Sequence, residues 1–302
     1  MSSVVRLHDH DVAITGRVVR EARLQEEWFE DVADPEAMIA SLKADSPKAD
    51  VFTFWQRLPD VAPRYRYYSE PDDVAALRIN SYEDWWSHQL TSRTRGLVRK
   101  SAKLGVVVRE TEYTDDFVRG MTSIFNETPI RQGRRFWHYG KDFDTLKRQF
   151  SRCLFREKLI GAYLDDELIG FMMIGYADRY VLVGQIISKI RHRDKNPNNA
   201  LMAKAVEMCA RDRMPYLVYL SWGTGSLAEF KRRNGFEKTS LPRYYVPLTV
   251  RGECALKLGV HKGFRHLIPE STQAHLKHLR TKWYLGIESL RGRTPVTGDG
   301  EV

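Results

Sequence analysis

Three apolar segments follow one another between residues 158 and 188, separated by breaks of only a few residues. The segments read KLIGAYL, LIGFMMIGY and YVLVGQIIS, and the breaks contain Asp165-Asp166-Glu167 and Asp178-Arg179. Breaks this short leave room for hairpin turns and little else, so the pattern predicts an antiparallel meander. An α/β fold follows, because helical patterns flank the meander on both sides.

The segments around the meander complete a regular order of elements. Helices are predicted over 114–126 and 143–155, and a further helix begins near Pro197, which suits a first-turn position. The next strand, YLVYLSW, is almost wholly apolar and is therefore expected to be buried on both faces, as in a parallel pairing. A short helix, SLAEFKRR, ends at Asn234-Gly235, and RYYVPL is the last strand. Residues 104–249 thus read β-α-α-β-β-β-α-β-α-β.

The N-terminal part is less regular. Strands are predicted over Arg23–Val32 and Val51–Leu58, on either side of a helix that Asp34-Pro35-Glu36 opens. A second helix is predicted over 80–103, with Asn80 or Ser81 as its cap.

Composition limits the class of protein. Of the 302 residues, 42% are hydrophobic and 29% are charged, which excludes wholesale disorder. The longest apolar runs are strand-sized, so no membrane span is expected, and the N-terminus MSSVVRLHDHD carries charge where a signal peptide is apolar. The three cysteines show neither a disulfide framework nor metal-ligand spacing. We therefore expect a cytoplasmic protein that binds no metal.

The charge is unevenly distributed along the chain. Residues 1–90 carry 10 Lys and Arg against 17 Asp and Glu, whereas residues 91–302 carry 38 against 22. A basic body indicates an anionic partner: a nucleotide cofactor, RNA, a sugar nucleotide or an anionic membrane surface. Solubilising surface charge is the alternative.

The order of elements over 104–249, with the helix end FKRRNGF, resembles the GNAT acyltransferase superfamily. The resemblance implies a GNAT-like fold with a mixed central sheet and flanking helices, in which the strands YVLVGQIIS and YLVYLSW splay apart. The acyl-carrying cofactor, acyl-CoA, is expected between them, with its pyrophosphate at the start of the following helix, where free N–H groups favour an anion. The implied cofactor-binding residues are Ile187, Ser188, Lys189, Arg191, Asn198, Asn199 and Phe230.

Two departures from the superfamily pattern refine the resemblance. N-acetyltransferases of the superfamily carry a Gln/Arg-x-x-Gly-x-Gly/Ala loop, whereas the loop here, RDKNPNNA, contains no glycine. A tyrosine general acid often stands four residues before the final glycine, a position that Lys231 occupies here. The chain is similar to the bacterial, Fem-like branch of the superfamily in both of these departures. It is also similar to that branch in the Phe230-Lys231 pair and in the basic stretch before residue 104. Its members are tandem GNAT proteins, some of which use aminoacyl-tRNA.

Four parts of the chain are expected. The resemblance implies a degenerate GNAT-like half at 1–95 and the acyltransferase core at 96–250, and the residues that follow predict a helical segment at 251–293 and a disordered tail at 294–302. The helical segment carries an apolar stripe beside three cations. It is expected to pack on the body, to pair with another subunit, or to form a peripheral contact with an anionic membrane.

The loop 126–142 is the most site-like segment, because arginine, aromatic and proton-accepting residues are dense in it. Glu127 or His138 is a candidate base for an acceptor amine. The candidate substrate-binding residues are Arg131, Gln132, Arg134, Trp137, Tyr139 and, at the end of the apolar strand, Trp222. A solvated loop anchored by its aromatics is the alternative reading, and strand-end packing is the alternative for Trp222.

Lys231 is the third catalytic candidate, as a fixed cation near the reacting group or a donor phosphate; the alternative is a helix-surface lysine. Five cations and no acid lie within residues 92–103. They either bind phosphates or form a solvated helix face.

Three functions follow as hypotheses. The first is an N-acyltransferase with an acyl-thioester donor, acyl-CoA or acyl carrier protein, and an amine acceptor, with backbone N–H groups near Ile187 and Ser188 holding the oxyanion. The second is aminoacyl-tRNA-dependent transfer, which the basic body favours. The third is a non-catalytic protein of the same fold that binds nucleotides or membranes.

Overall fold

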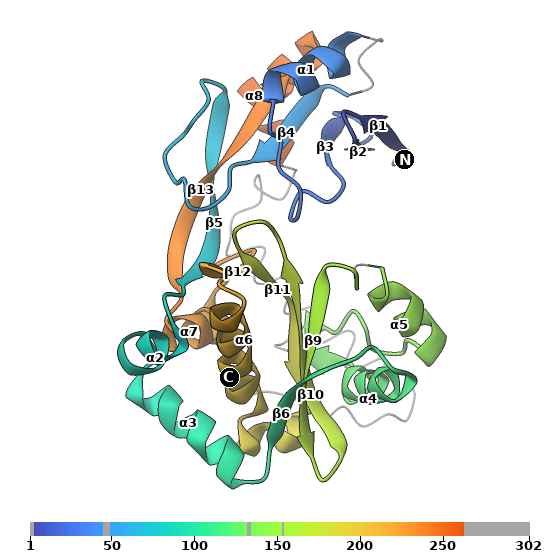
Figure 1. The fold of residues 1–302 in the computed structure, drawn as a ribbon. Coiled ribbons are helices and arrows are strands. Elements are labelled where there is room, and N and C mark those ends of the chain that lie inside the picture. Colours follow the sequence, from blue (N-terminus) through green and yellow to red (C-terminus); the bar gives the residue numbers. More distant parts are fainter. Residues whose placement is uncertain (1–2, 45–48, 132–133, 153, 263–302) are drawn as a thin grey trace. The chain divides into compact units, whose positions relative to one another are not determined.

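A computed structural model describes residues 3–44, 49–131, 134–152 and 154–262. The chain forms two compact units (Figure 1). Of the described residues, those up to Val74 and those from Thr239 onward form unit 1, and those from Ala75 to Lys238 form unit 2. The functional boundaries predicted at residues 95 and 250 stay predictions. The predicted C-terminal helical segment lies outside the described residues from 263 onward, as does the tail.

Unit 1 is a twisted sheet covered by short helices. Its strands lie in the order β1-β2-β3-β4-β13. The elements are β1 (Ser3–Leu7), β2 (His10–Thr15), β3 (Glu21–Leu24), α1 (Pro35–Ala44), β4 (Val51–Trp55), the start of β5 (Tyr68–Arg78), β13 (Glu237–Pro247), α8 (Val250–Lys257) and η3 (Val260–Lys262). One apolar core joins β2, β3, α1, β4 and β13.

The sequence predictions for unit 1 are partly confirmed. The helix opened by Asp34-Pro35-Glu36 and the strand from Val51 are present. The strand predicted over Arg23–Val32 is wrong beyond Leu24. There the amides of Phe29 and Glu30 both bond to the carbonyl of Glu26, so the backbone forms turns instead of a ladder. The strands β1 and β2 were not predicted.

Unit 2 carries the predicted order of elements up to the helix SLAEFKRR, whereas the last predicted strand, RYYVPL, lies at the end of β13 in unit 1. Its sheet runs β5-β12-β11-β10-β9-β6, where only the last residues of β5 take part. The elements are α2 (Tyr82–Asp84), η1 (Trp85–Gln89), α3 (Ser92–Lys103), β6 (Val107–Thr111), α4 (Asp115–Phe125), β7 (Ile130–Arg131), β8 (Arg134–Arg135), α5 (Phe143–Phe150), β9 (Glu157–Leu164), β10 (Glu167–Tyr176), β11 (Val181–Ser188), η2 (Ile190–Lys195), α6 (Pro197–Arg211), β12 (Tyr216–Tyr219) and α7 (Gly225–Arg233).

The predicted meander is confirmed. β9, β10 and β11 pair antiparallel, and Asp165 and Asp166 form the first turn with φ of 47° and 65°. Two positive φ values are what a two-residue hairpin needs, and Asp tolerates them better than most residues. Helix α6 covers one face of this sheet, and α4 and α5 cover the other (Figure 1). β10 is therefore buried on both sides.

Two predicted helices are shorter than expected. The helix over 80–103 begins as predicted, with Ser81 accepting the N–H of Asp84 at 3.0 Å. It breaks at Leu90, whose backbone is extended, and restarts as α3 after the Thr91 cap. The helix over 143–155 ends at Phe150, since Ser151 caps it.

The predicted splay between β11 and β12 is present. The two strands pair in parallel only through Val181 with Leu217 and Leu182 with Val218. β11 continues to Ser188, whereas β12 ends at Tyr219. Beyond Leu182, β11 pairs with β10 alone, and its other edge is open.

Candidate functional site

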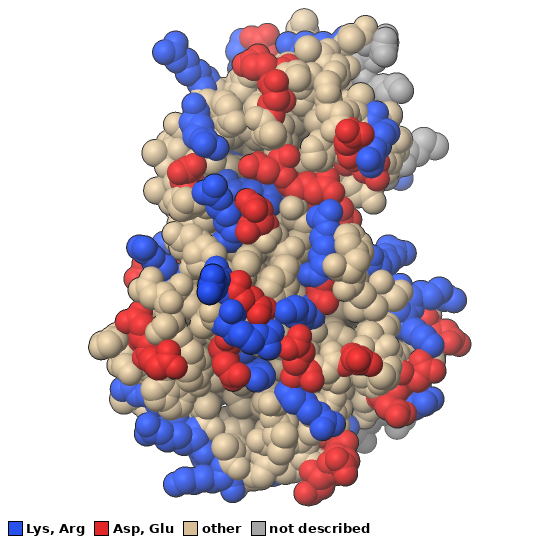
Figure 2. Space-filling model, viewed as in Figure 1, with Lys and Arg blue, Asp and Glu red and all other residues tan. Residues whose placement is uncertain are grey.

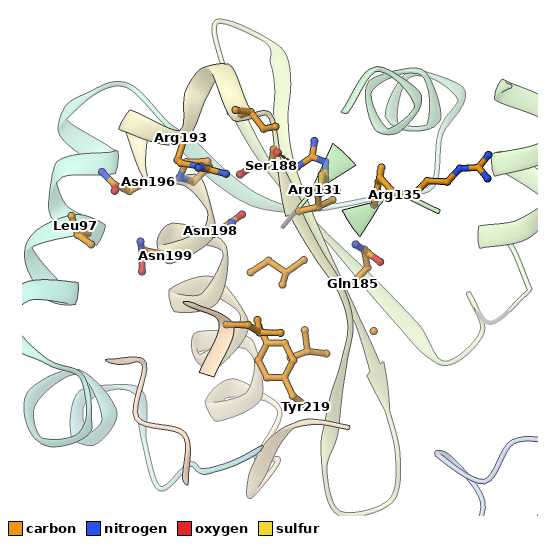
Figure 3. Close-up of a pocket in the computed structure, with 18 residues that line it drawn as sticks. Leu97, Arg131, Arg135, Gln185, Ser188, Arg193, Asn196, Asn198, Asn199 and Tyr219 are labelled. Carbon is orange, nitrogen blue, oxygen red and sulfur yellow. Dashed lines mark hydrogen bonds between the residues drawn. The ribbon is translucent and has the colours of Figure 1, made fainter. Parts of the chain in front are cut away.

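A pocket of about 440 Å³ occupies the open edge of β11 within unit 2 (Figure 3). Its walls come from β11, the start of α6, the ribbon of β7 and β8, and single residues of α3, β12 and α7. The lining residues are Leu97, Arg131, Arg135, Phe136, Val183, Gly184, Gln185, Ile186, Ile187, Ser188, Ile190, Arg193, Asn196, Pro197, Asn198, Asn199, Tyr219 and Leu227.

The backbone of β11 presents polar groups on its open edge. The N–H of Lys189 donates to the carbonyl of Ile169 in β10 at 2.7 Å. Because successive residues of a strand alternate sides, the N–H groups of Ser188 and Ile186 face away from β10. Those two groups, and not the N–H of Ile187, are therefore the ones available to an oxyanion. This refines the predicted oxyanion position by one residue.

The start of α6 forms the second wall. Asn196 takes a left-handed conformation with φ of 55°, and Pro197 opens the helix. Asn196 makes no side-chain cap bond. Asn198 and Asn199 line the pocket in the first turn, and the Oδ1 of Asn198 is buried without a hydrogen-bond partner. A helix start of this kind presents partial positive charge to the pocket.

Glu127 and Arg131 stabilise the pocket wall through hydrogen bonds to its backbone. The carboxylate of Glu127 accepts the N–H groups of Ile190 at 2.6 Å and Arg191 at 3.1 Å. It also accepts Nη2 of Arg131 at 3.2 Å. Arg131 lines the pocket, and its Nη1 donates to the carbonyl of Ser188 at 2.9 Å. The pair thus joins the end of β11 to the segment that leads into α6.

Glu167 engages the predicted cofactor cations. Its carboxylate accepts from Lys189 and Arg191, and lies 3.2 Å from Nε2 of His192. Lys189 is only 5% exposed. Burial alone would raise the pKa of Glu167, but Lys189 and the other cations hold it below its usual range. Lys189 and Arg191 therefore anchor the segment, and Arg193 is the cation of this segment that lines the pocket.

His138 belongs to an aromatic cluster on the other side of unit 2's sheet. Its ring stacks on Phe125 at 4.5 Å and lies 5.2 Å from Phe150. Burial, with a smaller contribution from Lys141, lowers the pKa of His138 to about 4. The imidazole is therefore neutral at pH 7, and it does not line the pocket.

The remaining loop residues lie apart from the pocket or are not fully described by the structure. Trp137 is 76% exposed, with Nζ of Lys141 5.0 Å from its ring. Tyr139 is half-buried, and its N–H donates to the carbonyl of Phe136. Gln132 lies outside the described residues. Arg134 forms part of β8, but its side chain is not described.

Lys231 is buried, so the surface-lysine alternative is wrong. The side chain is 1% exposed, and Nζ donates to the carbonyls of Ser221 at 2.5 Å and Trp222 at 3.1 Å. Nζ also lies 4.4 Å from the ring centroid of Tyr219. Burial lowers the pKa of Lys231 to about 8. Phe230 and Trp222 pack in or against the apolar core beside α6 and do not line the pocket.

Tyr219 and Gln185 are pocket residues that the sequence analysis missed. The hydroxyl of Tyr219 is buried without a partner, and burial raises its pKa, so the phenol stays protonated. A tyrosine within an apolar strand gave no sign of this; the strand end beside the splay was the only available signal. Of the predicted residues, the pocket brings together Arg131, Ile187, Ser188, Asn198 and Asn199.

Comparison with solved structures identifies the fold. FemX aligns with a TM-score of 0.58 at 10% identity, over 85% of this chain and 90% of that chain. The chain has a GNAT-like fold of the Fem type. The DUF2156 C-terminal domain of a protein named as a lysylphosphatidylglycerol synthetase, from Agrobacterium fabrum, aligns with a TM-score of 0.60 at 10% identity, over 87% and 88% of the two chains.

A third structure shares the Fem-type fold. L-PGS from Bacillus licheniformis aligns with a TM-score of 0.54 at 13% identity, over 81% of this chain and 83% of that chain. No protein-family model and no curated protein sequence matches the chain. Identities this low concern the fold and do not identify the reaction.

Proposed function

We propose that unit 2 is an N-acyltransferase that moves an acyl group from a thioester, acyl-CoA or acyl carrier protein, to an amine. The observation that carries the proposal is the pocket where β11 and β12 diverge, with the start of α6 in its wall. A thioester carried on a phosphorylated arm fits this arrangement, because the arm needs a groove and its phosphates need N–H donors. Arg193 adds a cation to the same wall.

The proposed reaction uses the open edge of β11. The acceptor nitrogen attacks the thioester carbonyl, and the N–H groups of Ile186 and Ser188 stabilise the oxyanion. The C–N bond forms, the C–S bond breaks, and the sulfur leaves as a thiolate that takes up a proton. The described pocket lining contains no carboxylate and no histidine. We therefore propose that the amine loses its proton to water, because Glu127 and His138, the two candidate bases from the sequence, do not line the pocket.

Lys231 acts indirectly in this proposal, through a residue that lines the pocket. Its ammonium group lies against the ring of Tyr219, which lines the pocket, and holds two carbonyls of the loop that follows β12. It is thus a fixed positive charge behind the pocket wall. Lys231→Arg is expected to keep part of the activity and Lys231→Met to lose most of it.

The test is the binding of coenzyme A, measured as a shift in melting temperature. It compares the wild type with a matched pair of arginine variants. Arg193→Ala removes a pocket cation, whereas Arg191→Ala removes a cation that Glu167 engages away from the pocket. We expect coenzyme A to raise the melting temperature of the wild type and of Arg191→Ala, and to raise that of Arg193→Ala much less. Native mass spectrometry of protein purified from cells would identify a bound thioester. Equal responses of the two variants would contradict this site.

Aminoacyl-tRNA is the second candidate donor. The observation that favours it is helix α3, which contributes Leu97 to the pocket and exposes Arg93, Arg99, Lys100 and Lys103. Phosphates neutralised by these side chains would make tRNA binding steeply dependent on salt. Binding of tRNA with a steep salt dependence, without any response to coenzyme A, would favour this donor. No response to either, with binding to vesicles, would favour a non-catalytic role.

A further inference from the structure

Two large aromatic side chains of unit 2 are displayed to solvent in the same way. Trp137 and Phe155 are each 76% exposed. Nζ of Lys141 lies 5.0 Å from the ring of Trp137, and the guanidinium of Arg156 lies 5.1 Å from the ring of Phe155. A single exposed aromatic needs no explanation, but two rings with cations beside them near one helix end form a patch.

Both rings are connected to the C-terminal end of α5, Trp137 from the loop before the helix and Phe155 from the chain after it. Nζ of Lys141 donates to Oε1 of Gln149 at 2.7 Å, which ties the Trp137 loop to the last turn of that helix. Phe150 ends α5. Phe155 follows it by five residues, a stretch that spans at most about 18 Å when fully extended. Trp137 therefore lies near the last turn of α5, and Phe155 lies within that distance of the end of the helix.

This end of the helix is positively charged. Asp142, the cap of α5, and Asp144 lie at its start, whereas Arg148 and Lys147, which pairs with Asp115, occupy its last turn. Arg148 and Arg152 are exposed. Figure 2 shows basic side chains projecting at the side of unit 2 where α5 lies in Figure 1, with acidic side chains among them. Aromatic rings among cations are typical of surfaces that insert into the headgroup region of an anionic membrane.

We propose that Trp137, Phe155, Arg148 and Arg152 form a docking surface for an anionic lipid bilayer. The rings enter the interface, and the guanidinium groups bind lipid phosphates. Phe136, which lines the pocket, precedes Trp137 directly, so docking brings the pocket wall close to the bilayer. Nucleic acid is the less favoured partner, because stacking on bases requires a groove that follows the strand.

The test is co-sedimentation of the full-length protein with vesicles. We expect binding to vesicles that contain phosphatidylglycerol and little binding to pure phosphatidylcholine. Trp137→Ala and Phe155→Ala should each weaken the partition about tenfold, since each removes an inserted ring. Arg148→Gln and Arg152→Gln should each weaken it about fivefold. All four side chains are exposed, so unchanged melting temperatures will show that the variants are folded.

Matched controls come from α3 and its end. Arg93→Gln and Lys103→Gln remove exposed cations elsewhere in unit 2, and Leu104→Ala removes an exposed apolar side chain. These variants should bind vesicles like the wild type.

Three results would overturn the proposal. The first is equal binding to neutral and anionic vesicles. The second is binding that is unchanged by both aromatic substitutions. If such binding is lost only on Trp283→Ala, the contact with the membrane belongs to the C-terminal segment. The third is that the protein does not bind vesicles but binds RNA through Trp137.

Discussion

Replacing Lys231 by Met tests the buried ammonium group directly. In the folded chain this group is 1% exposed, and its contacts are two backbone carbonyls and the ring of Tyr219. Carbonyls and an aromatic face stabilise a cation less than water does, which is why burial lowers the pKa of Lys231 to about 8 from 10.5. Methionine keeps most of the side-chain length and removes the charge.

The magnitude follows from the two pKa values. Between pH 8 and 10.5 the unfolded chain keeps the proton and the folded chain releases it, so stability rises with pH in this window. Below pH 8 both states are protonated, and the full cost of burying the charge is present. A pKa depressed from 10.5 to about 8 corresponds to about 3 kcal/mol. The free energy of unfolding of the wild type, minus that of Lys231→Met, should therefore increase by about 3 kcal/mol from pH 7.5 to 10.5.

Urea unfolding of both proteins at several pH values measures this difference, and most other titrating groups cancel in it. At pH 7 the variant still loses about 1–3 kcal/mol for each carbonyl left without a donor, partly offset by the relieved charge. Lys103→Met, at an exposed lysine of α3, is the control and should show no pH-dependent difference. A difference between wild type and Lys231→Met that stays flat from pH 7.5 to 10.5 would refute the buried, charged lysine.

Four further predictions follow from the pocket and its supports. Glu127→Gln should lower the free energy of unfolding by about 1–3 kcal/mol in urea titrations, because the amide group cannot accept all of the N–H groups that the carboxylate accepts. Asn196→Ala should destabilise by about 1–2 kcal/mol and Asn196→Gly by less, as measured by thermal unfolding, because φ is positive there. His138→Phe should remove part of the acid destabilisation between pH 6.5 and 4, where the folded imidazole resists protonation, and should leave turnover unchanged. Tyr219→Phe should unfold at the same urea concentration as the wild type or a higher one, because the lost hydroxyl has no partner.

The fold was largely predictable because its strongest signals are local. The three apolar segments with two short breaks allow few arrangements other than the meander, and the apolar strand YLVYLSW indicated a buried parallel neighbour. The break at Leu90 was not predictable from periodicity. It depends on Thr91, which caps α3. In the sequence, a threonine at this position is as compatible with the surface of a continuous helix as with the start of a new one.

The site was harder to predict because its residues are explained by partners far away in the sequence. Glu127 appeared to be a free base beside arginines, but its carboxylate accepts N–H groups 63 and 64 residues further along the chain. His138 appeared functional, but Phe125 and Phe150 enclose it. Density of reactive residue types in one loop therefore indicated an important segment without indicating what each side chain does. The strands that form the pocket were identified more reliably, since the resemblance to the GNAT superfamily implied that these two strands splay apart.

The glycine-free loop shows how a missing motif can be replaced by other means. Glycine in such a loop supplies left-handed backbone and close approach to an anion. Here Asn196 supplies the left-handed conformation, which asparagine tolerates better than most residues, and Pro197 starts the helix immediately afterwards. Glu127 and Glu167 hold the preceding segment through its backbone and its cations. An anchored turn of this kind can present N–H groups to an anion without glycine, so a search for the glycine pattern alone would miss the site.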